Sequence, residues 1–115
     1  MKKIAFVLAI ILALSVPLSV SAATYALTIR PVLSFEGTTA TCEVTVVGNK
    51  MSDHIEVEMK LMHGNTCLAT WYKDGYGYVN LEKTATVVKG QTYEIVVTVT
   101  MNDVSHTPVS QSGTC

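Results

Sequence analysis

The chain has 115 residues, 49% of them hydrophobic, with 8 Lys or Arg against 9 Asp or Glu. This length suits one domain with one modest core and is too short for two domains of ordinary size. The nearly balanced charge, with no basic patch, argues against nucleic acid or an anionic membrane as the partner.

Residues 1–22 have the order of a secretory signal peptide. Two lysines follow the first methionine, an apolar stretch covers residues 4–16, and small residues lead to a predicted cleavage site after Ala22. Cleavage after Ala23 is the alternative. The apolar stretch is shorter than the ~20 residues of a membrane-spanning helix. We therefore predict a secreted mature domain over residues 23–115, with a net charge of about −3 and no membrane insertion after cleavage.

The mature sequence begins with three segments in which apolar and polar residues alternate, the pattern of half-buried strands. The first covers residues 25–35 and is interrupted at Pro31, which is typical of an edge strand. The second covers residues 39–46. The third, residues 55–61, has the clearest alternation, with aliphatic side chains on one face and Glu or Lys on the other.

Four further strands follow. Residues 67–72 form the fourth and lead into a glycine-rich loop over residues 73–77. The fifth covers residues 79–87, the sixth covers residues 93–101, and the last begins near residue 107. Seven short strands without a helical period predict an all-β, two-sheet antiparallel sandwich, and a small barrel is the alternative.

Tyr93 is a candidate tyrosine corner. It follows Val87 by six residues, with Gly90 between them and Ile95 two residues later. This spacing resembles the corner of fibronectin type III and immunoglobulin-like domains, in which the hydroxyl holds the loop between the fifth and sixth strands. The alternative is an ordinary core tyrosine at the start of a strand.

A set of core and turn positions over nearly the whole mature chain carries a family resemblance. These positions are residues 40–42 with Val44, residues 47–48, residues 55–61, Trp71, residues 81–84, residues 89–90 and Tyr93. On them, the chain resembles a group of small, functionally uncharacterised secreted bacterial proteins with an immunoglobulin-like β-sandwich of about seven strands. The resemblance implies a scaffold and no active site. Cys67 and Cys115 are not part of the pattern of that group.

The candidates for a disulfide are Cys42, Cys67 and Cys115. An odd number of cysteines in an exported protein predicts one disulfide and one remaining thiol, or a thiol that joins two chains. In an up-and-down strand order the three lie at the same end of the sandwich, so all three pairings stay open. Cys42 has inward parity and is also interpreted as a small buried hydrophobic residue.

Four aromatic residues around the predicted 73–77 loop are the candidates for a binding surface: Trp71, Tyr72, Tyr76 and Tyr78. Planar side chains at a sheet edge can stack on sugar rings or contact a protein. The alternative places Trp71 inside the sandwich with Cys67 and Ala69, as a core tryptophan, and leaves the tyrosines as loop packing.

Catalytic and metal-binding patterns are weak in this sequence. Ser105 and His106 are adjacent on a strand end, so they point to opposite faces, and no G-x-S-x-G elbow accompanies them. The scattered histidines and cysteines lack the paired spacing of a zinc site, so neither a metal nor another cofactor is predicted.

These observations favour a secreted, non-enzymatic binding module that contacts an extracellular protein or glycan through loops or sheet edges. A structural or assembly protein of the cell surface is one alternative, with a cysteine or a strand edge joining chains. A secreted protease inhibitor acting through residues 73–78 is the other. The predicted oligomeric state is a monomer or a disulfide-linked dimer.

Overall fold

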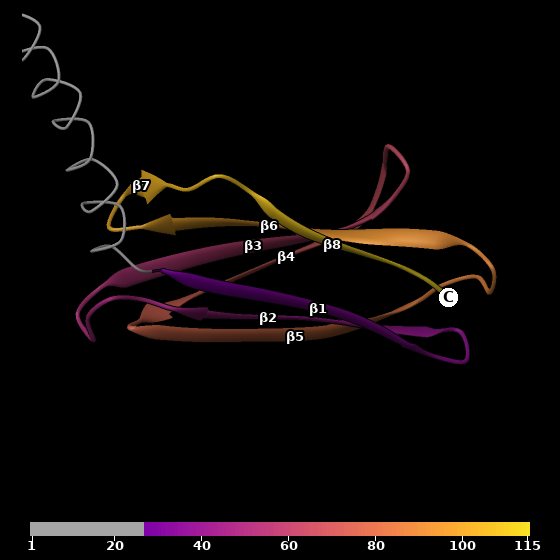
Figure 1. Ribbon diagram of the computed structural model, residues 1–115, viewed down its shortest axis with the longest axis horizontal. Coiled ribbons are helices and arrows are strands. Elements are labelled where there is room, and N and C mark those ends of the chain that lie inside the picture. Colours follow the sequence, from indigo (N-terminus) through magenta and orange to yellow (C-terminus); the bar gives the residue numbers. More distant parts are fainter. Residues whose placement is uncertain (1–26) are drawn as a thin grey trace, which may run out of the picture.

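The computed structural model describes residues 27–115, which form two antiparallel sheets (Figure 1). The predicted signal peptide and its cleavage site lie outside the described residues. The three-stranded sheet has the order β1-β2-β5, made of β1 (Thr28–Glu36), β2 (Thr39–Val47) and β5 (Tyr78–Thr86). The predicted all-β sandwich is confirmed by this arrangement.

The five-stranded sheet has β3 and β6 at its centre. Its order is β4-β3-β6, and two short strands share the other edge of β6. The strands are β3 (His54–His63), β4 (Thr66–Tyr76), β6 (Thr92–Met101), β7 (Val104–Ser105) and β8 (Val109–Thr114). The last predicted strand, from about residue 107, corresponds to β8, whereas β7 was not predicted; residues 106–108 lie outside the ladder between the two.

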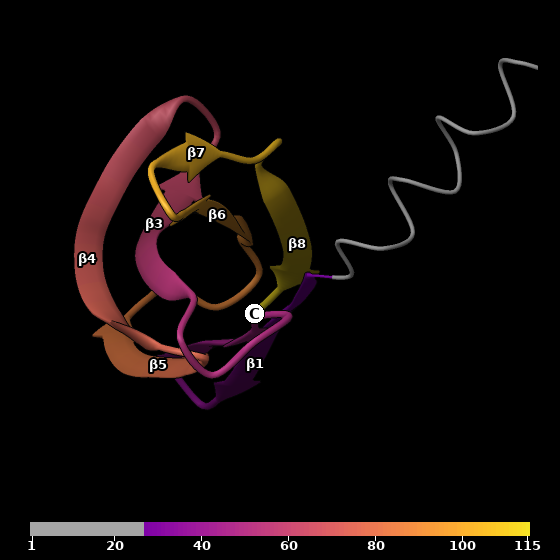
Figure 2. The same cartoon turned by 90° about the vertical axis from the view of Figure 1, so that its left-hand side faces the viewer.

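The core lies between the two sheets and is built by alternation. Every second residue of β2, β3 and β6 is buried, including Val44, Ile55, Leu61, Ile95 and Val97, which are fully inaccessible to solvent. Figure 2, seen end-on, shows β4 and β5 along one side of the sandwich and β1 and β8 along the other. The part of the chain that the structure describes contains no helix long and apolar enough to cross a membrane.

Residues 73–76, which the sequence suggests are part of a loop, belong to β4 in the structure. Pairing with β3 continues until Tyr76 lies opposite His54, and β5 begins at Tyr78. The connection between the sheets is therefore a sharp corner at Gly77, whose φ of 75° suits glycine. The loop prediction was wrong, because Gly75 lies within β4 and Gly77 forms the corner between the sheets.

Tyr93 links β6 to the loop that precedes it. Its hydroxyl accepts a hydrogen bond of 2.8 Å from the backbone N–H of Val88. Its ring is close to those of His63 and Phe35, with centroid distances of 5.1 and 6.1 Å. This is the geometry of a tyrosine corner, in which one side chain holds the loop between β5 and β6.

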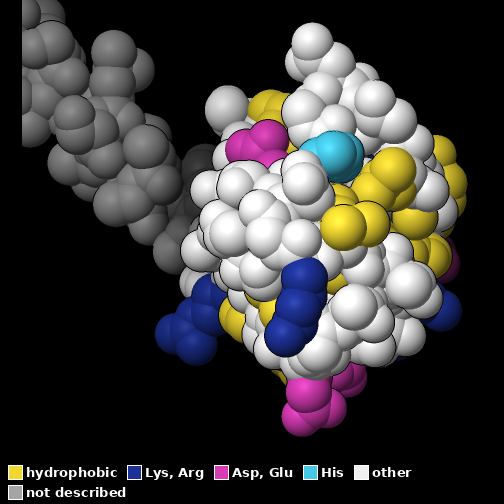
Figure 3. All heavy atoms as spheres, turned by 90° about the vertical axis from the view of Figure 1, so that its right-hand side faces the viewer, with side chains coloured by type: hydrophobic (Ala, Val, Ile, Leu, Met, Phe, Trp, Pro, Cys, Tyr) yellow, Lys and Arg dark blue, Asp and Glu magenta, His cyan; other side chains and the backbone are white. Residues whose placement is uncertain are grey.

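One end of the sandwich, here called the C-terminal end, gathers the β1–β2 turn, the β5–β6 loop and Cys115. Backbone hydrogen bonds of 2.8 to 2.9 Å join Val87 to Thr38, Gly90 to Cys115 and Cys115 to Gln91. Figure 3 looks onto this end and shows apolar side chains gathered on one side, next to a histidine. The opposite end, called the corner end, carries Gly77.

Candidate functional site

The outer face of the five-stranded sheet carries an open groove of about 510 Å³. Three strands contribute to it: β3, β4 and β6. The residues that line it are Glu56, Val57, Glu58, Tyr72, Lys73, Asp74, Thr98 and Thr100. The groove is therefore of mixed polarity, with carboxylates, hydroxyls, one lysine and one aromatic ring along its walls.

Strand register arranges these side chains in two rows across the sheet. Asp74, Glu56 and Thr100 form one row, since Glu56 pairs with both of the others. Tyr72, Glu58 and Thr98 form the next row in the same way. Neighbouring strands are ~4.8 Å apart. Each row thus offers three side chains to a ligand that crosses the sheet.

Tyr72 is the aromatic side chain of the groove and is 71% exposed. A hydrogen bond to Glu58, together with the negative charge of that carboxylate, raises the pKa of the Tyr72 phenol. Glu58 is the register partner of Tyr72 on the neighbouring strand, so the carboxylate and the phenol project from the same face of the sheet. The exposed Tyr72 ring presents a surface on which a planar or ring-shaped ligand can stack.

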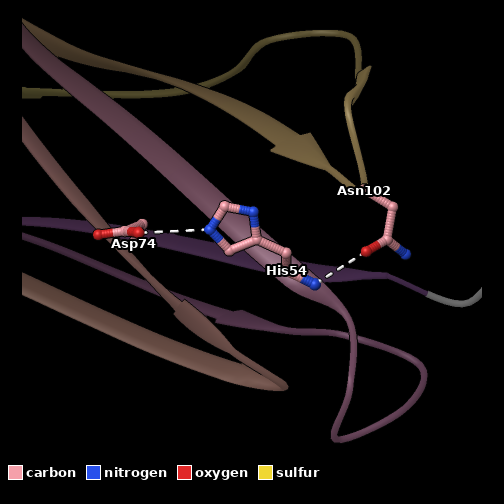
Figure 4. Close-up of polar contacts among 3 residues, drawn as sticks. All are labelled: His54, Asp74 and Asn102. Atoms are coloured by element: carbon pink, nitrogen blue, oxygen red, sulfur yellow. Dashed lines mark hydrogen bonds and ion pairs between the residues drawn. The ribbon is translucent and has the colours of Figure 1, made fainter.

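His54 lies at the corner end of the groove, where it contacts Asp74 (Figure 4). The distance between His54 Nε2 and Asp74 Oδ2 is 3.3 Å. The imidazole also stacks on Tyr76, with ring centroids 4.9 Å apart and planes inclined by 30°. Asn102 fixes the backbone of His54, because its Oδ1 accepts from the His54 N–H at 2.9 Å.

Asp53 holds together the loops that support this end. Its Oδ2 accepts hydrogen bonds from the backbone N–H groups of Asn49 and Lys50, and its Oδ1 accepts from the Asn102 side chain at 3.0 Å. The Asp53 carbonyl accepts from the N–H of Gly77 at 2.8 Å. One buried residue therefore ties the 48–53 loop, the corner and the β6–β7 turn to each other.

Acid should weaken this end of the molecule. The hydrogen bonds from Asn102, Lys50 and Asn49 lower the pKa of Asp53 below its ordinary value of 3.8. Its contribution to stability is complete above the unfolded-state pKa and is lost as pH falls through the lower, folded-state value. We expect the melting temperature of Asp53→Asn to be lower than wild type near pH 7 and to change less between pH 4 and pH 2.

The control for that experiment is Asp103→Asn, at an exposed carboxylate in the adjacent turn. Asp103 has a φ of 67°, which asparagine also tolerates. Melting curves measured across this pH range should be nearly the same for Asp103→Asn and wild type. An Asp53→Asn curve parallel to that of wild type would contradict the role assigned to Asp53.

The structure separates the four aromatic candidates. Trp71 lies on the inner face of β4, opposite the buried Met59, and packs half-buried against the core. Tyr72 and Tyr76 lie on the outer face of β4, and both are exposed. Tyr78 lies beyond the corner, opposite Val47 on the outer face of the other sheet. Only Tyr72 and Tyr76 therefore share a surface.

The prediction of a disulfide within the chain was wrong, because Cys42, Cys67 and Cys115 are all free thiols. Cys42 is fully enclosed in β2, and burial raises its pKa to about 11. Cys115 instead donates its thiol proton to the Gly37 carbonyl, with Sγ 3.2 Å from the oxygen.

Cys67 is exposed because of a register shift in β4. Leu61 pairs with Ala69, whereas Met62 pairs with Cys67, so Leu68 is an extra residue in the strand. This bulge turns Cys67 away from the face that Ala69 and Trp71 share. The predicted grouping of Cys67 with those two residues in the core was therefore also wrong.

The carboxylates of the groove were not singled out from the sequence. The alternation of residues 55–61 placed Glu56 and Glu58 on a solvated face, which is where the structure has them. Their approach to Asp74 and Tyr72 depends on the pairing of β3 with β4, which a single sequence does not specify. Within residues 27–115, no group of three or more His, Cys, Asp or Glu side chains is arranged to hold a metal ion.

Comparison with known proteins gives a likeness in fold. No protein-family model matches the chain, and no curated protein matches it in sequence. Among solved structures, it is similar to the sensor domain of the anti-sigma factor RsgI4 from Pseudobacteroides cellulosolvens, with a TM-score of 0.50 and 14% sequence identity. The match covers 80% of this chain and 96% of that domain. At this identity the likeness bears on the β-rich fold alone.

Proposed function

We propose that this chain is a secreted, non-enzymatic module that binds an extracellular glycan on the outer face of its five-stranded sheet. The observation that carries the proposal is the open groove in which an exposed tyrosine lies beside carboxylates and hydroxyls. Aromatic faces can stack on sugar rings, while carboxylate and threonine oxygens can accept hydrogen bonds from sugar hydroxyls. A role in binding is also compatible with the fold likeness to a sensor domain.

Two further observations support the non-enzymatic role and an immunoglobulin-like fold. Within the described residues, neither His54 nor His63 is hydrogen-bonded to a serine, threonine or cysteine that would act as a nucleophile. The Tyr93 contact supports an immunoglobulin-like assignment, and so does the division of the strands, with the first, second and fifth in one sheet and the third and sixth in the other. The fourth strand is the difference, because it pairs with the third here and with the fifth in constant-type immunoglobulin domains.

Tyr72→Ala should weaken glycan binding. Loss of the apolar ring surface that a ligand would cover costs about 1–2 kcal/mol, which corresponds to roughly 5- to 30-fold weaker binding. The purified protein and its variants are applied to a glycan array, and affinities are then measured by calorimetry for the glycans retained.

Tyr78→Ala is the matched control, because Tyr78 is 54% exposed on the outer face of the other sheet. We expect it to bind like wild type. Retention of no glycan, or equal binding by Tyr72→Ala and wild type, would remove the support for this function. Binding of an extracellular protein in place of any glycan would favour the protein-binding alternative.

Assembly through a thiol is a second candidate function, favoured by the exposure of Cys67 on the edge strand β4. In an oxidising compartment, two such thiols can form an intermolecular disulfide. Under this alternative, wild type migrates as a covalent dimer on a non-reducing gel, while Cys67→Ser and reduced samples migrate as monomers. A wild-type monomer after oxidation would argue against it.

A further inference from the structure

The groove contains two facing carboxylates, and within the described residues only one of them has an ion-pair partner. Glu56 and Asp74 lie directly opposite each other on β3 and β4, an arrangement that is destabilising for like charges. Asp74 contacts His54, and Glu58 lies 4.0 Å from Lys60. Within residues 27–115, Glu56 makes neither a hydrogen bond nor an ion pair.

The same face carries a line of side chains along β4. Tyr72, Asp74 and Tyr76 follow each other at alternate positions, so all three project from the outer face. With a rise of 3.2–3.4 Å per residue, the two tyrosines are separated by roughly 13 Å along the strand. This line joins the groove to the His54–Tyr76 stack at the corner end. A long ligand can therefore contact an aromatic ring on either side of the carboxylate pair.

We infer that the ligand is a linear oligosaccharide of amino sugars with free ammonium groups, bound along β4. This inference rests on the proposed glycan-binding function and specifies its substrate class. Sugar rings stack on Tyr72 and Tyr76, and an ammonium group lies between Glu56 and Asp74. An ammonium has three donors and forms charge-assisted hydrogen bonds with carboxylates, so it offsets the repulsion between the two facing carboxylates.

A saccharide fits this surface better than a basic peptide does. The row that contains the carboxylate pair ends at Thr100 and the adjacent row ends at Thr98. These hydroxyls both donate and accept hydrogen bonds, as the hydroxyls of a sugar require.

The test compares three hexasaccharides that differ in one substituent: β-1,4-linked glucosamine, N-acetylglucosamine and glucose. Binding to the full chain is measured by calorimetry at low and high salt. We expect glucosamine hexamer to bind about tenfold or more tightly than the other two, because only it has charge-assisted contacts. Its affinity should fall with salt, and Glu56→Gln and Asp74→Asn should each remove most of the preference.

Glu82→Gln is the matched control. Glu82 also faces a like charge in register, Glu43, but on the three-stranded sheet and away from the groove. It should retain the preference for glucosamine. Thermal unfolding checks that the groove variants are folded, which we expect because each substitution relieves a like-charge contact.

The remaining outcomes separate this inference from the function on which it rests. Equal binding of the three hexamers, still dependent on Tyr72, would overturn the amino-sugar inference and leave glycan binding in place. Glucosamine binding that is unaffected by Tyr72→Ala would count against the proposed function itself. If the protein bound hexalysine but none of the three sugars, and this binding depended on Glu56, the amino-sugar inference and the glycan-binding function would both be overturned in favour of a basic peptide ligand.

Discussion

Leu61→Ala lowers the free energy of unfolding by about 2–5 kcal/mol, the largest effect that we expect of a single side chain. Leu61 is fully inaccessible to solvent on β3, where it lies opposite Ile95 of β6 and Ala69 of β4. Truncation removes buried apolar surface and leaves a cavity between the sheets. Since small domains are stable by only about 5–15 kcal/mol, urea denaturation should show a large shift of the midpoint.

Leu68→Ala provides the same chemical change at a different site. Leu68 is 47% exposed at the bulge in β4, so its truncation should cost well under half as much. Similar midpoints for the two variants would mean that Leu61 is not in the core. The alternation along β3, on which the position of the groove depends, would then be wrong.

Gly77→Ala is the second large effect. At a φ of 75°, any other L-residue is strained by about 1–2 kcal/mol. A Cβ at this position would also lie 2.9 Å from Met51 Cα and 3.2 Å from the Met51 carbonyl oxygen. These are backbone atoms, so the 48–53 loop would have to move, at a cost of about 1–3 kcal/mol more. The expected total is about 2–5 kcal/mol, measured by urea denaturation.

Gly64→Ala separates the two causes. Gly64 has a similar φ of 61°, but no atom lies within 4 Å of its added Cβ. It should therefore show only the conformational cost of about 1–2 kcal/mol. If Gly77→Ala lowered the free energy of unfolding no more than Gly64→Ala does, the close approach of Met51 to the corner would be contradicted. Because Tyr76 precedes the corner, Gly77→Ala should also weaken binding at that end of the groove.

Most of the architecture was predictable because a half-buried strand has a period of two. Residues 55–61 alternate strictly, and the structure has a strand there with the aliphatic residues inside. The spacing of Val87, Gly90 and Tyr93 indicated a contact across the β5–β6 loop, and the structure has a hydrogen bond from Val88 to Tyr93. Both signals are local, so a single sequence contains them.

Features that depend on neighbouring strands were not predictable in the same way. One extra residue, Leu68, reverses the orientation of Cys67, and nothing in the local pattern indicates it. The glycines at 75 and 77 were interpreted as a loop, whereas Gly75 lies within β4. A Cβ added to Gly75 would lie 3.2 Å from the Val79 side chain. The pairing of Glu56 with Asp74 depends on register across a hairpin, so the groove became visible only in three dimensions.

The central claim is that the ligand lies on the outer face of the five-stranded sheet. Amide chemical-shift mapping by NMR, with the glycan that the array retains most strongly, tests it most directly. The account predicts the largest shifts at Glu56, Glu58 and Thr100, with Thr41 and Thr84 on the other sheet unchanged. Largest shifts on the three-stranded sheet or at the C-terminal end would contradict it.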